Sequence, residues 1–164
     1  MPAREGNWRG SIRIVRSEKV ITGPYMDDSM IAALFDAAAK VRQQAHAPYS
    51  GFAVGAALRA DDGQIYTGCN VENAAYPSGT CAEQGAISAM VAAGARRIEA
   101  IAVLGDGTRP VTPCGACRQR ISEFATATTM IVAANLAGTQ TRFTCAELLP
   151  DSFRADLLPN GKRG

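Results

Sequence analysis

The sequence predicts a single α/β domain in which helices cover a sheet with a parallel half. This follows from the order of its periodic segments: a helix and a β-hairpin come first, and helices and strands then alternate. The length of 164 residues fits one domain. An apolar content of 47% with 20% charged residues is typical of a folded globular chain.

The first half of the domain predicts the helix and the hairpin. A helix is expected to run to about Ala45, where Pro48 ends the pattern. Its apolar stripe at helical spacing is Ile31, Leu34, Phe35, Ala38 and Val41-Arg42. Strands are expected over 52–59 and 64–69, joined by a tight turn at Asp61-Asp62-Gly63. The cap of the helix is expected at Asp27, Asp28 or Ser29.

The second half predicts the alternating part of the fold. A loop over 70–79 leads into a helix from Cys81 to about Ala93, which Gly94 stops. The helix carries many small residues, which suit close backbone packing against either a sheet or another subunit. The remaining elements are expected to be a strand over 98–104, a helix over 114–124, strands over 128–134 and 140–144, and a short helix over 145–149.

The two ends of the chain are expected to lie outside this domain. Residues 1–24 predict an arm, either a poorly ordered terminus or a strand that adds to a partner subunit, because Ile12 and Ile14 favour β structure. The domain itself is expected over 25–158, and 159–164 form a tail.

Charge and cysteine content limit the partners and the compartment. A net charge of +2 gives no support to a broad nucleic-acid or membrane surface. No apolar run reaches the roughly 18 residues that span a bilayer. Five cysteines, an odd number, favour metal binding and free thiols over a disulfide framework, and so predict a cytoplasmic location.

Three cysteines in two short motifs predict a metal site. Cys114 and Cys117 have the Cys-x-x-Cys spacing that lets two thiolates reach one ion, and Cys81 offers a third ligand. Three protein ligands leave one tetrahedral position of zinc open, as in catalytic sites. Both motifs fall at predicted helix starts, where the helix dipole favours thiolate. A closed structural site that adds Cys69 or Cys145 is the alternative, while His46 is expected at the surface.

Glu83 is the candidate proton carrier beside this metal, but a second interpretation exists. Thr80-x-x-Glu83 also matches a capping box, in which the two side chains satisfy backbone amides at a helix start. The same tetrapeptide recurs at Thr144-Cys145-Ala146-Glu147, which we interpret as a cap only. The first copy differs because Pro113-Cys114-x-x-Cys117 accompanies it, and this combination is typical of zinc deaminases.

Five motifs in this order resemble the cytidine deaminase family, specifically its small homotetrameric type with a three-cysteine zinc site. The resemblance extends from about Met26 to Leu158. It implies a three-layer α/β/α fold with a central mixed five-stranded sheet and a homotetramer. The motifs are Ala47-Pro48-Tyr49-Ser50-Gly51-Phe52, Cys69-Asn70-Val71-Glu72-Asn73, Cys81-Ala82-Glu83, Pro113-Cys114-Gly115-Ala116-Cys117-Arg118-Gln119 and Glu147-Leu148-Leu149-Pro150.

The resemblance also implies the role of each site residue. Cys81, Cys114 and Cys117 match the zinc ligands, and Glu83 matches the proton shuttle. The implied substrate contacts are Asn70 and Glu72 at the ribose hydroxyls, Phe52 and Ala82 in the nucleoside site, and Phe153 from a neighbouring subunit. Without the resemblance, Asn70 and Glu72 are also compatible with solvated loop residues, and Phe52 and Phe153 with ordinary packing.

The implied activity is zinc-dependent hydrolytic deamination of cytidine and deoxycytidine to uridine and deoxyuridine, in pyrimidine salvage. The alternatives are an aminohydrolase for another cytosine nucleoside such as blasticidin S, and a zinc-stabilised binding module without turnover. One position departs from the family, because Gln84 stands where arginine commonly follows Cys-Ala-Glu. Compensation of the thiolate charge is therefore expected from backbone amides or from another cation such as Arg118.

Overall fold

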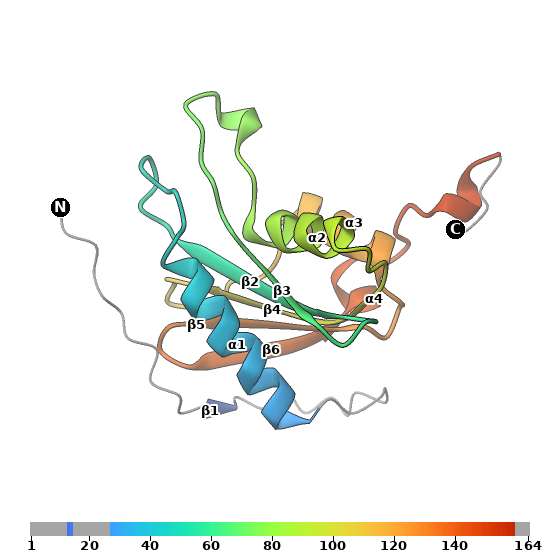
Figure 1. Cartoon of the computed structure of the whole chain (residues 1–164), viewed down its shortest axis with the longest axis horizontal. Coiled ribbons are helices and arrows are strands. Elements are labelled where there is room, and N and C mark those ends of the chain that lie inside the picture. Colours follow the sequence, from blue (N-terminus) through green and yellow to red (C-terminus); the bar gives the residue numbers. More distant parts are fainter. Residues whose placement is uncertain (1–12, 15–26, 160–164) are drawn as a thin grey trace.

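A mixed sheet forms the middle layer of the molecule, with helices on both faces (Figure 1). The computed structural model describes residues 13–14 and 27–159. The five expected strands are present, and a two-residue strand extends one edge, giving the order β1-β6-β5-β4-β2-β3. The strands are β1 (Arg13–Ile14), β2 (Val54–Ala60), β3 (Ile65–Cys69), β4 (Ile98–Gly105), β5 (Met130–Asn135) and β6 (Thr139–Thr144).

Strand pairing confirms a mixed sheet. β4 and β5 run parallel, while β2–β3, β2–β4 and β5–β6 are antiparallel. The parallel pair follows from the helix between β4 and β5, because parallel neighbours need a long crossover. The β2–β3 hairpin turns as predicted, with Gly63 at φ +78°, a left-handed conformation that favours glycine.

The helices lie close to their predicted ranges. α1 (Asp28–Arg42) covers one face of the sheet, and the other three cover the opposite face. α1 ends three residues before the expected Ala45, because the Gln44 N–H bonds the carbonyl three residues back, at Val41 (2.9 Å), and tightens the last turn. The helices of the opposite face are α2 (Ala82–Ala92), α3 (Gly115–Phe124) and α4 (Cys145–Leu148).

The apolar stripe of α1 forms the smaller of two cores. The Asp27 side chain accepts the Ser29 N–H at the helix start, so one of the three expected caps is confirmed. Four of the predicted stripe residues are buried against small and branched residues of β2, β4 and β5: Ile31, Leu34, Phe35 and Ala38.

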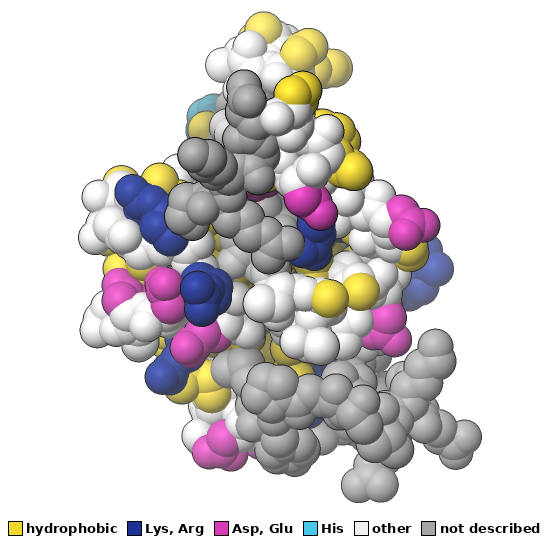
Figure 2. Space-filling view, turned by 90° about the vertical axis from the view of Figure 1, so that its right-hand side faces the viewer, with side chains coloured by type: hydrophobic (Ala, Val, Ile, Leu, Met, Phe, Trp, Pro, Cys, Tyr) yellow, Lys and Arg dark blue, Asp and Glu magenta, His cyan; other side chains and the backbone are white. Residues whose placement is uncertain are grey.

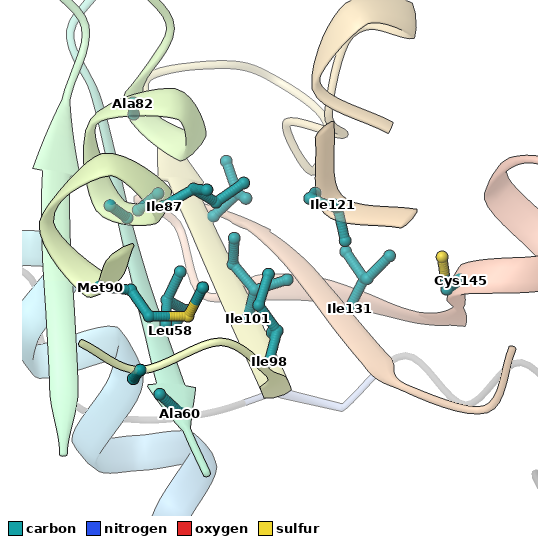
Figure 3. Close-up of a cluster of buried hydrophobic side chains, with 14 of the residues drawn as sticks. Leu58, Ala60, Ala82, Ile87, Met90, Ile98, Ile101, Ile121, Ile131 and Cys145 are labelled. Atoms are coloured by element: carbon teal, nitrogen blue, oxygen red, sulfur yellow. The ribbon is translucent and has the colours of Figure 1, made fainter. Parts of the chain in front are cut away.

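The larger core lies under α2 and α3. Ile87 and Met90 of α2 point onto Leu58 and Ile101 of the sheet (Figure 3). Ile121 of α3 extends the same cluster. Because this core fixes both helices to one face of the sheet, it also fixes the position of their N-termini.

α2 approaches β3 unusually closely at Gly68. A Cβ at Gly68 would lie 2.3 Å from the Ala86 nitrogen and 2.4 Å from the Ala82 oxygen, and both are backbone atoms. Gly85 faces the same contact, because a Cβ at Gly85 would lie 3.2 Å from the Gly68 Cα. The small residues on this side of α2 therefore serve the contact with the sheet, as the first of the two interpretations of its composition proposed.

The N-terminal arm is described at one point. Arg13 and Ile14 pair in parallel with Thr139 and Gln140 of the same chain. In the single chain this short strand adds to its own sheet, and the rest of the predicted arm lies outside the described residues. Within the described ranges, no helix combines the length and the hydrophobicity that a membrane span requires.

The contact at Gly68 gives a test of the fold. We expect Gly68→Ala to lower the free energy of unfolding by about 1–3 kcal/mol or more, because the new methyl group meets helix backbone that cannot rotate away. Denaturant titration measures this change. Gly115→Ala is the control, since a Cβ there meets nothing within 4 Å. Equal stability of both variants would contradict the close packing of α2 on β3.

Candidate metal centre and substrate cleft

The three predicted cysteines converge at the starts of two helices. Cys81 is the N-cap residue of α2, Cys114 is the N-cap residue of α3, and Cys117 lies in the first turn of α3. Their Sγ atoms all lie within 4.8 Å of one another. The Cys81 side chain makes no capping bond to its helix, and the Cys114 thiol accepts the Cys117 N–H. Both thiols belong to the cluster.

The geometry of the cluster fits zinc. Two thiolates on one tetrahedral zinc, at about 2.3 Å each, lie roughly 3.8 Å apart. Cys81 Sγ and Cys114 Sγ are separated by 3.8 Å. Within the described part of the chain, the metal-ligand cluster contains neither Cys69 nor Cys145. The donor set is therefore three thiols, as predicted, which leaves one coordination position to a non-protein ligand.

The electrostatics of the three thiols favour a cation. Burial, followed by the proximity of the other acidic groups, raises the pKa of Cys81 and of Cys117. Burial acts in the same direction on Cys114, but hydrogen bonds from the Cys117 backbone and from the neighbouring thiols outweigh it and lower the pKa of Cys114. A bound cation would stabilise all three as thiolates, and its binding would release protons.

Glu83 lies beside the cysteines and is nearly inaccessible to solvent. It is the second residue of α2, and only 4% of its surface is exposed. Burial raises the pKa of its carboxyl group, while hydrogen bonding to Cys117 and the charge of Arg120 act in the opposite direction. A carboxyl group of raised pKa can hold a proton near neutral pH and give it up again.

The two copies of the Thr-Cys-Ala-Glu motif have different structures. At α4, Thr144 and Glu147 form the reciprocal capping box. At α2 the N-cap residue is Cys81, and the Thr80 backbone instead pairs with Val71. The capping interpretation of Thr80 and Glu83 is therefore wrong, and that of Thr144 and Glu147 is confirmed.

A cleft of about 500 Å³ extends from the metal centre between two loops. One loop follows α1 and the other joins β3 to α2, and both rise on the same side of the sheet (Figure 1). A cleft of this size suits a small molecule such as a nucleoside. The residues that line it are Tyr49, Ser50, Asn70, Val71, Glu72, Asn73, Tyr76, Gly79, Thr80 and Cys81.

Backbone hydrogen bonds join these loops to the metal centre. The His46 N–H donates to the Asn70 carbonyl (3.0 Å), and the Glu72 N–H donates to the His46 carbonyl (2.7 Å). Val71, between them, pairs on its other side with Thr80 through two bonds of 2.9 Å. Because Thr80 precedes a cysteine of the cluster, the cleft wall and the metal centre form one connected unit.

Asn70 uses its side chain to hold the start of β2. Its Oδ1 accepts the Val54 N–H (2.8 Å), and its Nδ2 donates to the Phe52 carbonyl (2.9 Å). One N–H of the amide is then left for another acceptor. The simple interpretation of Asn70 as a solvated loop residue is therefore wrong.

Glu72 is held as a carboxylate. It accepts the Tyr49 N–H (2.8 Å), the Ser50 N–H (3.2 Å) and the Ser50 hydroxyl. These bonds, that of the Ser50 hydroxyl first and then that of the Tyr49 N–H, hold the pKa of Glu72 below its usual range. Glu72 therefore presents a fixed negative acceptor to the cleft.

Three other predicted contacts lie apart from the lining of the cleft. Phe52 precedes β2 and is 38% exposed, so it is not a core residue. Ala82 is fully buried in the larger core (Figure 3). Phe153 is 58% exposed, so it is not packed under the last helix, and its carbonyl accepts a bond from Gln119 Nε2 (2.8 Å).

Two tyrosines of the cleft have no role in the predictions from sequence. Tyr49 and Tyr76 contact each other edge to face, with ring centroids 6.1 Å apart. Tyr76 is 78% exposed, and Figure 2 shows hydrophobic side chains gathered at the top of the molecule, where this loop lies. Arg118, considered as a partner for the thiolates, instead donates to the carbonyls of Pro113 and Leu148 (2.9 and 3.0 Å).

Three thiols at two helix starts, beside a buried carboxyl group and a nucleoside-sized cleft, define a zinc-binding enzyme site on an α/β/α sheet. The family of the cytidine and deoxycytidylate deaminase zinc-binding region matches residues 29–134. The chain belongs to this family.

Individual relatives agree with this assignment. A cytidine deaminase of Sporosarcina psychrophila is 49% identical over 119 residues, which cover 73% of this chain and 88% of the relative. A crystal structure of cytidine deaminase from Burkholderia pseudomallei is similar, with a TM-score of 0.71 and 46% identity, over 74% of this chain and 97% of that one. For cytidine deaminase from Mycobacterium tuberculosis the TM-score is 0.66 and the identity 34%, over 79% and 98% of the two chains.

The donor set predicts how metal content responds to mutation. We expect one zinc per chain, lost in Cys117→Ala and retained in Cys69→Ala and Cys145→Ala, because only Cys117 belongs to the three-thiol cluster. Elemental analysis of the purified proteins measures this. Loss of zinc in the Cys69 or Cys145 variant would point instead to a closed site with four thiolates.

Proposed function

We propose that this protein is a zinc-dependent cytidine deaminase, which replaces the 4-amino group of cytidine and deoxycytidine by oxygen and releases ammonia. The observation that carries the proposal is the position of Glu83, which is buried beside three thiols that fit zinc. The cleft that ends at Cys81 is large enough for a nucleoside.

In this proposal Cys81, Cys114 and Cys117 would hold zinc, which as a Lewis acid would activate water for attack at C4 of the base. Glu83 would accept one proton from the water and pass it to N3 of the base. It would then take the second proton from the new hydroxyl group at C4 and pass it to the departing amine. Its burial supports this role, because a carboxyl group whose pKa is raised exchanges protons more readily near neutral pH.

The sugar is recognised by Asn70 and Glu72. The remaining N–H of Asn70 donates to a sugar hydroxyl, and the Glu72 carboxylate accepts its proton. This pair suits an ordinary ribose or deoxyribose and favours these nucleosides over blasticidin S, the alternative substrate. Phe52 and Ala82 complete the nucleoside site in the proposal.

The proposal is tested by the fall in absorbance when the protein is mixed with cytidine. A zinc-stabilised binding module would hold the metal without turnover, and faster turnover of blasticidin S would favour the alternative substrate.

The role of Glu83 predicts a selective loss of activity. We expect Glu83→Gln to lower kcat by at least ~10³-fold while zinc is retained. The amide keeps the size of the side chain but cannot accept and return a proton as a carboxylate does. Steady-state kinetics and metal analysis measure the two quantities.

Glu147→Gln is the matched control. Its carboxylate accepts the Thr144 N–H at 2.9 Å, so we expect a loss of about 1 kcal/mol in stability and little change in kcat. Equal losses of activity in the two glutamate variants would reject a catalytic role for Glu83.

We further propose a homotetramer in the cytoplasm that serves pyrimidine salvage. Phe153, Leu157 and Leu158 are 58%, 66% and 50% exposed in the single chain, and the C-terminal segment extends away from the sheet (Figure 1). Apolar side chains on such a segment are suited to burial against another subunit. In this arrangement Phe153 completes the active site of a neighbour.

Truncation tests the assembly. Deletion from Pro150 onward is expected to raise KM for cytidine by about tenfold or more while zinc content stays at one per chain, because the metal cluster lies outside the deleted segment. Sedimentation velocity reports the oligomeric state. A full-length chain that is active as a monomer at the assay concentration would contradict the proposal.

A further inference from the structure

We propose that Ser50 is a positioning residue for sugar recognition, which fixes the Glu72 carboxylate and couples it to the backbone of Phe52. This inference rests on the proposed function, because it concerns how the sugar-binding residues are held. Ser50 lines the cleft and lies in the exposed turn between α1 and β2.

The direction of each hydrogen bond at Ser50 follows from its chemistry. The Phe52 N–H can only donate, and it donates to the Ser50 Oγ at 2.9 Å. The proton of the hydroxyl is then available for Glu72 Oε1, which accepts it. The Ser50 N–H meanwhile donates to Glu72 Oε2 at 3.2 Å. One serine thus holds both oxygens of the carboxylate and prevents its rotation.

The bonds also leave the two oxygens of Glu72 with different capacity to accept a bond from the substrate. Oε2 already accepts two backbone N–H groups, from Tyr49 and Ser50. Oε1 accepts only the Ser50 hydroxyl among the donors of the described residues, so it retains a lone pair for a sugar hydroxyl. The acceptor atom that the proposed function requires is therefore the atom that the serine side chain orients.

Ser50 also connects the two sugar-binding residues. Its Oγ holds the N–H of Phe52, and the carbonyl of the same Phe52 accepts the Asn70 amide at 2.9 Å. Glu72, Ser50, the Phe52 backbone and Asn70 thus form a continuous chain of hydrogen bonds. Loss of the serine hydroxyl breaks this chain in the middle and disturbs both sugar-binding groups.

The fold of the turn does not depend on the Ser50 hydroxyl. The Gly51 N–H donates to the Ala47 carbonyl at 3.0 Å, with Gly51 at φ +66°. The backbone bonds between His46 and residues 70–72 hold the loop in place. Removal of the hydroxyl is therefore expected to release the Glu72 carboxylate without unfolding the loop.

The test compares Ser50→Ala with the unmodified enzyme on cytidine and on 2′,3′-dideoxycytidine, which lacks both sugar hydroxyls of the ring. We expect KM for cytidine to rise about tenfold or more, in line with a hydrogen bond to a charged group, and kcat to change by less than about threefold. For dideoxycytidine kcat/KM should stay within about twofold. Ser50→Thr, which keeps the hydroxyl, should restore KM for cytidine.

The controls separate positioning from a general loss of structure. Ser88→Ala, on the exposed face of α2, should leave all constants unchanged. If Ser50→Ala lowered kcat/KM equally for both nucleosides, or changed neither, the inference would be overturned. Absence of deamination in the unmodified protein would instead overturn the proposed function.

A double-mutant cycle keeps the inference testable if Ser50→Ala is poorly stable. Calorimetry measures the Kd of uridine for Ser50→Ala, Glu72→Gln and the double variant. Because Ser50 acts through Glu72, we expect its substitution to weaken binding little once Glu72 is already replaced. Additive losses in Kd would show that Ser50 acts independently of Glu72 and would overturn the inference.

Discussion

The close contact between α2 and β3 is the constraint on which the site depends. Gly68 has backbone atoms of Ala82 and Ala86 where a side chain would otherwise lie, so the first turn of the helix is fixed against the sheet. That turn carries Cys81 and Glu83. The larger core holds α3 on the same face. Packing, rather than the metal ligands, therefore sets the distance between the two helix starts. This distance decides whether three thiols can share one ion.

Backbone hydrogen bonds likewise hold the walls of the cleft to the metal centre. The loop that follows α1 pairs with the Asn70–Glu72 segment, and this segment pairs with Thr80 beside the metal centre. Polar side chains in exposed loops are commonly mobile. Here most hydrogen-bonding groups of the Asn70 and Glu72 side chains are bonded to the protein, and only the remaining ones can bind a ligand. Such pre-organisation lowers the entropy lost on binding.

Much of this arrangement could be predicted from the sequence, because it depends on local signals. Helix periodicity, the Asp61-Asp62-Gly63 turn and the cysteine spacing each act within a few residues, and the elements they predicted lie within a few residues of the observed bounds. The distant Pro113-Cys114-x-x-Cys117 motif indicated which of the two Thr-Cys-Ala-Glu tetrapeptides belongs to the metal site. The structure places the capping box at Thr144, as expected.

The remainder could not be predicted because it depends on contacts between distant segments. Ser50 and Glu72 are 22 residues apart, and no spacing rule connects a serine in one turn with a glutamate in another loop. Arg118 directly follows Cys117 in sequence, yet its guanidinium donates to the carbonyl of Leu148, the last residue of α4. Local sequence patterns do not predict the proposed subunit contacts of Phe153 either, because they too join distant segments.

The two helix starts at the metal centre show that this site lowers the stability of its helices. N-cap positions normally carry serine, threonine, asparagine or aspartate, whose oxygen satisfies a backbone amide and stabilises the helix by about 1 kcal/mol. Cys81 and Cys114 occupy these positions. Cys81 makes no such bond, and the Cys114 thiol offers the Cys117 N–H only a sulfur, which is a weaker acceptor than oxygen. Selection for stability alone would place oxygen-bearing caps there, so the cysteines record a trade of helix stability for chemistry.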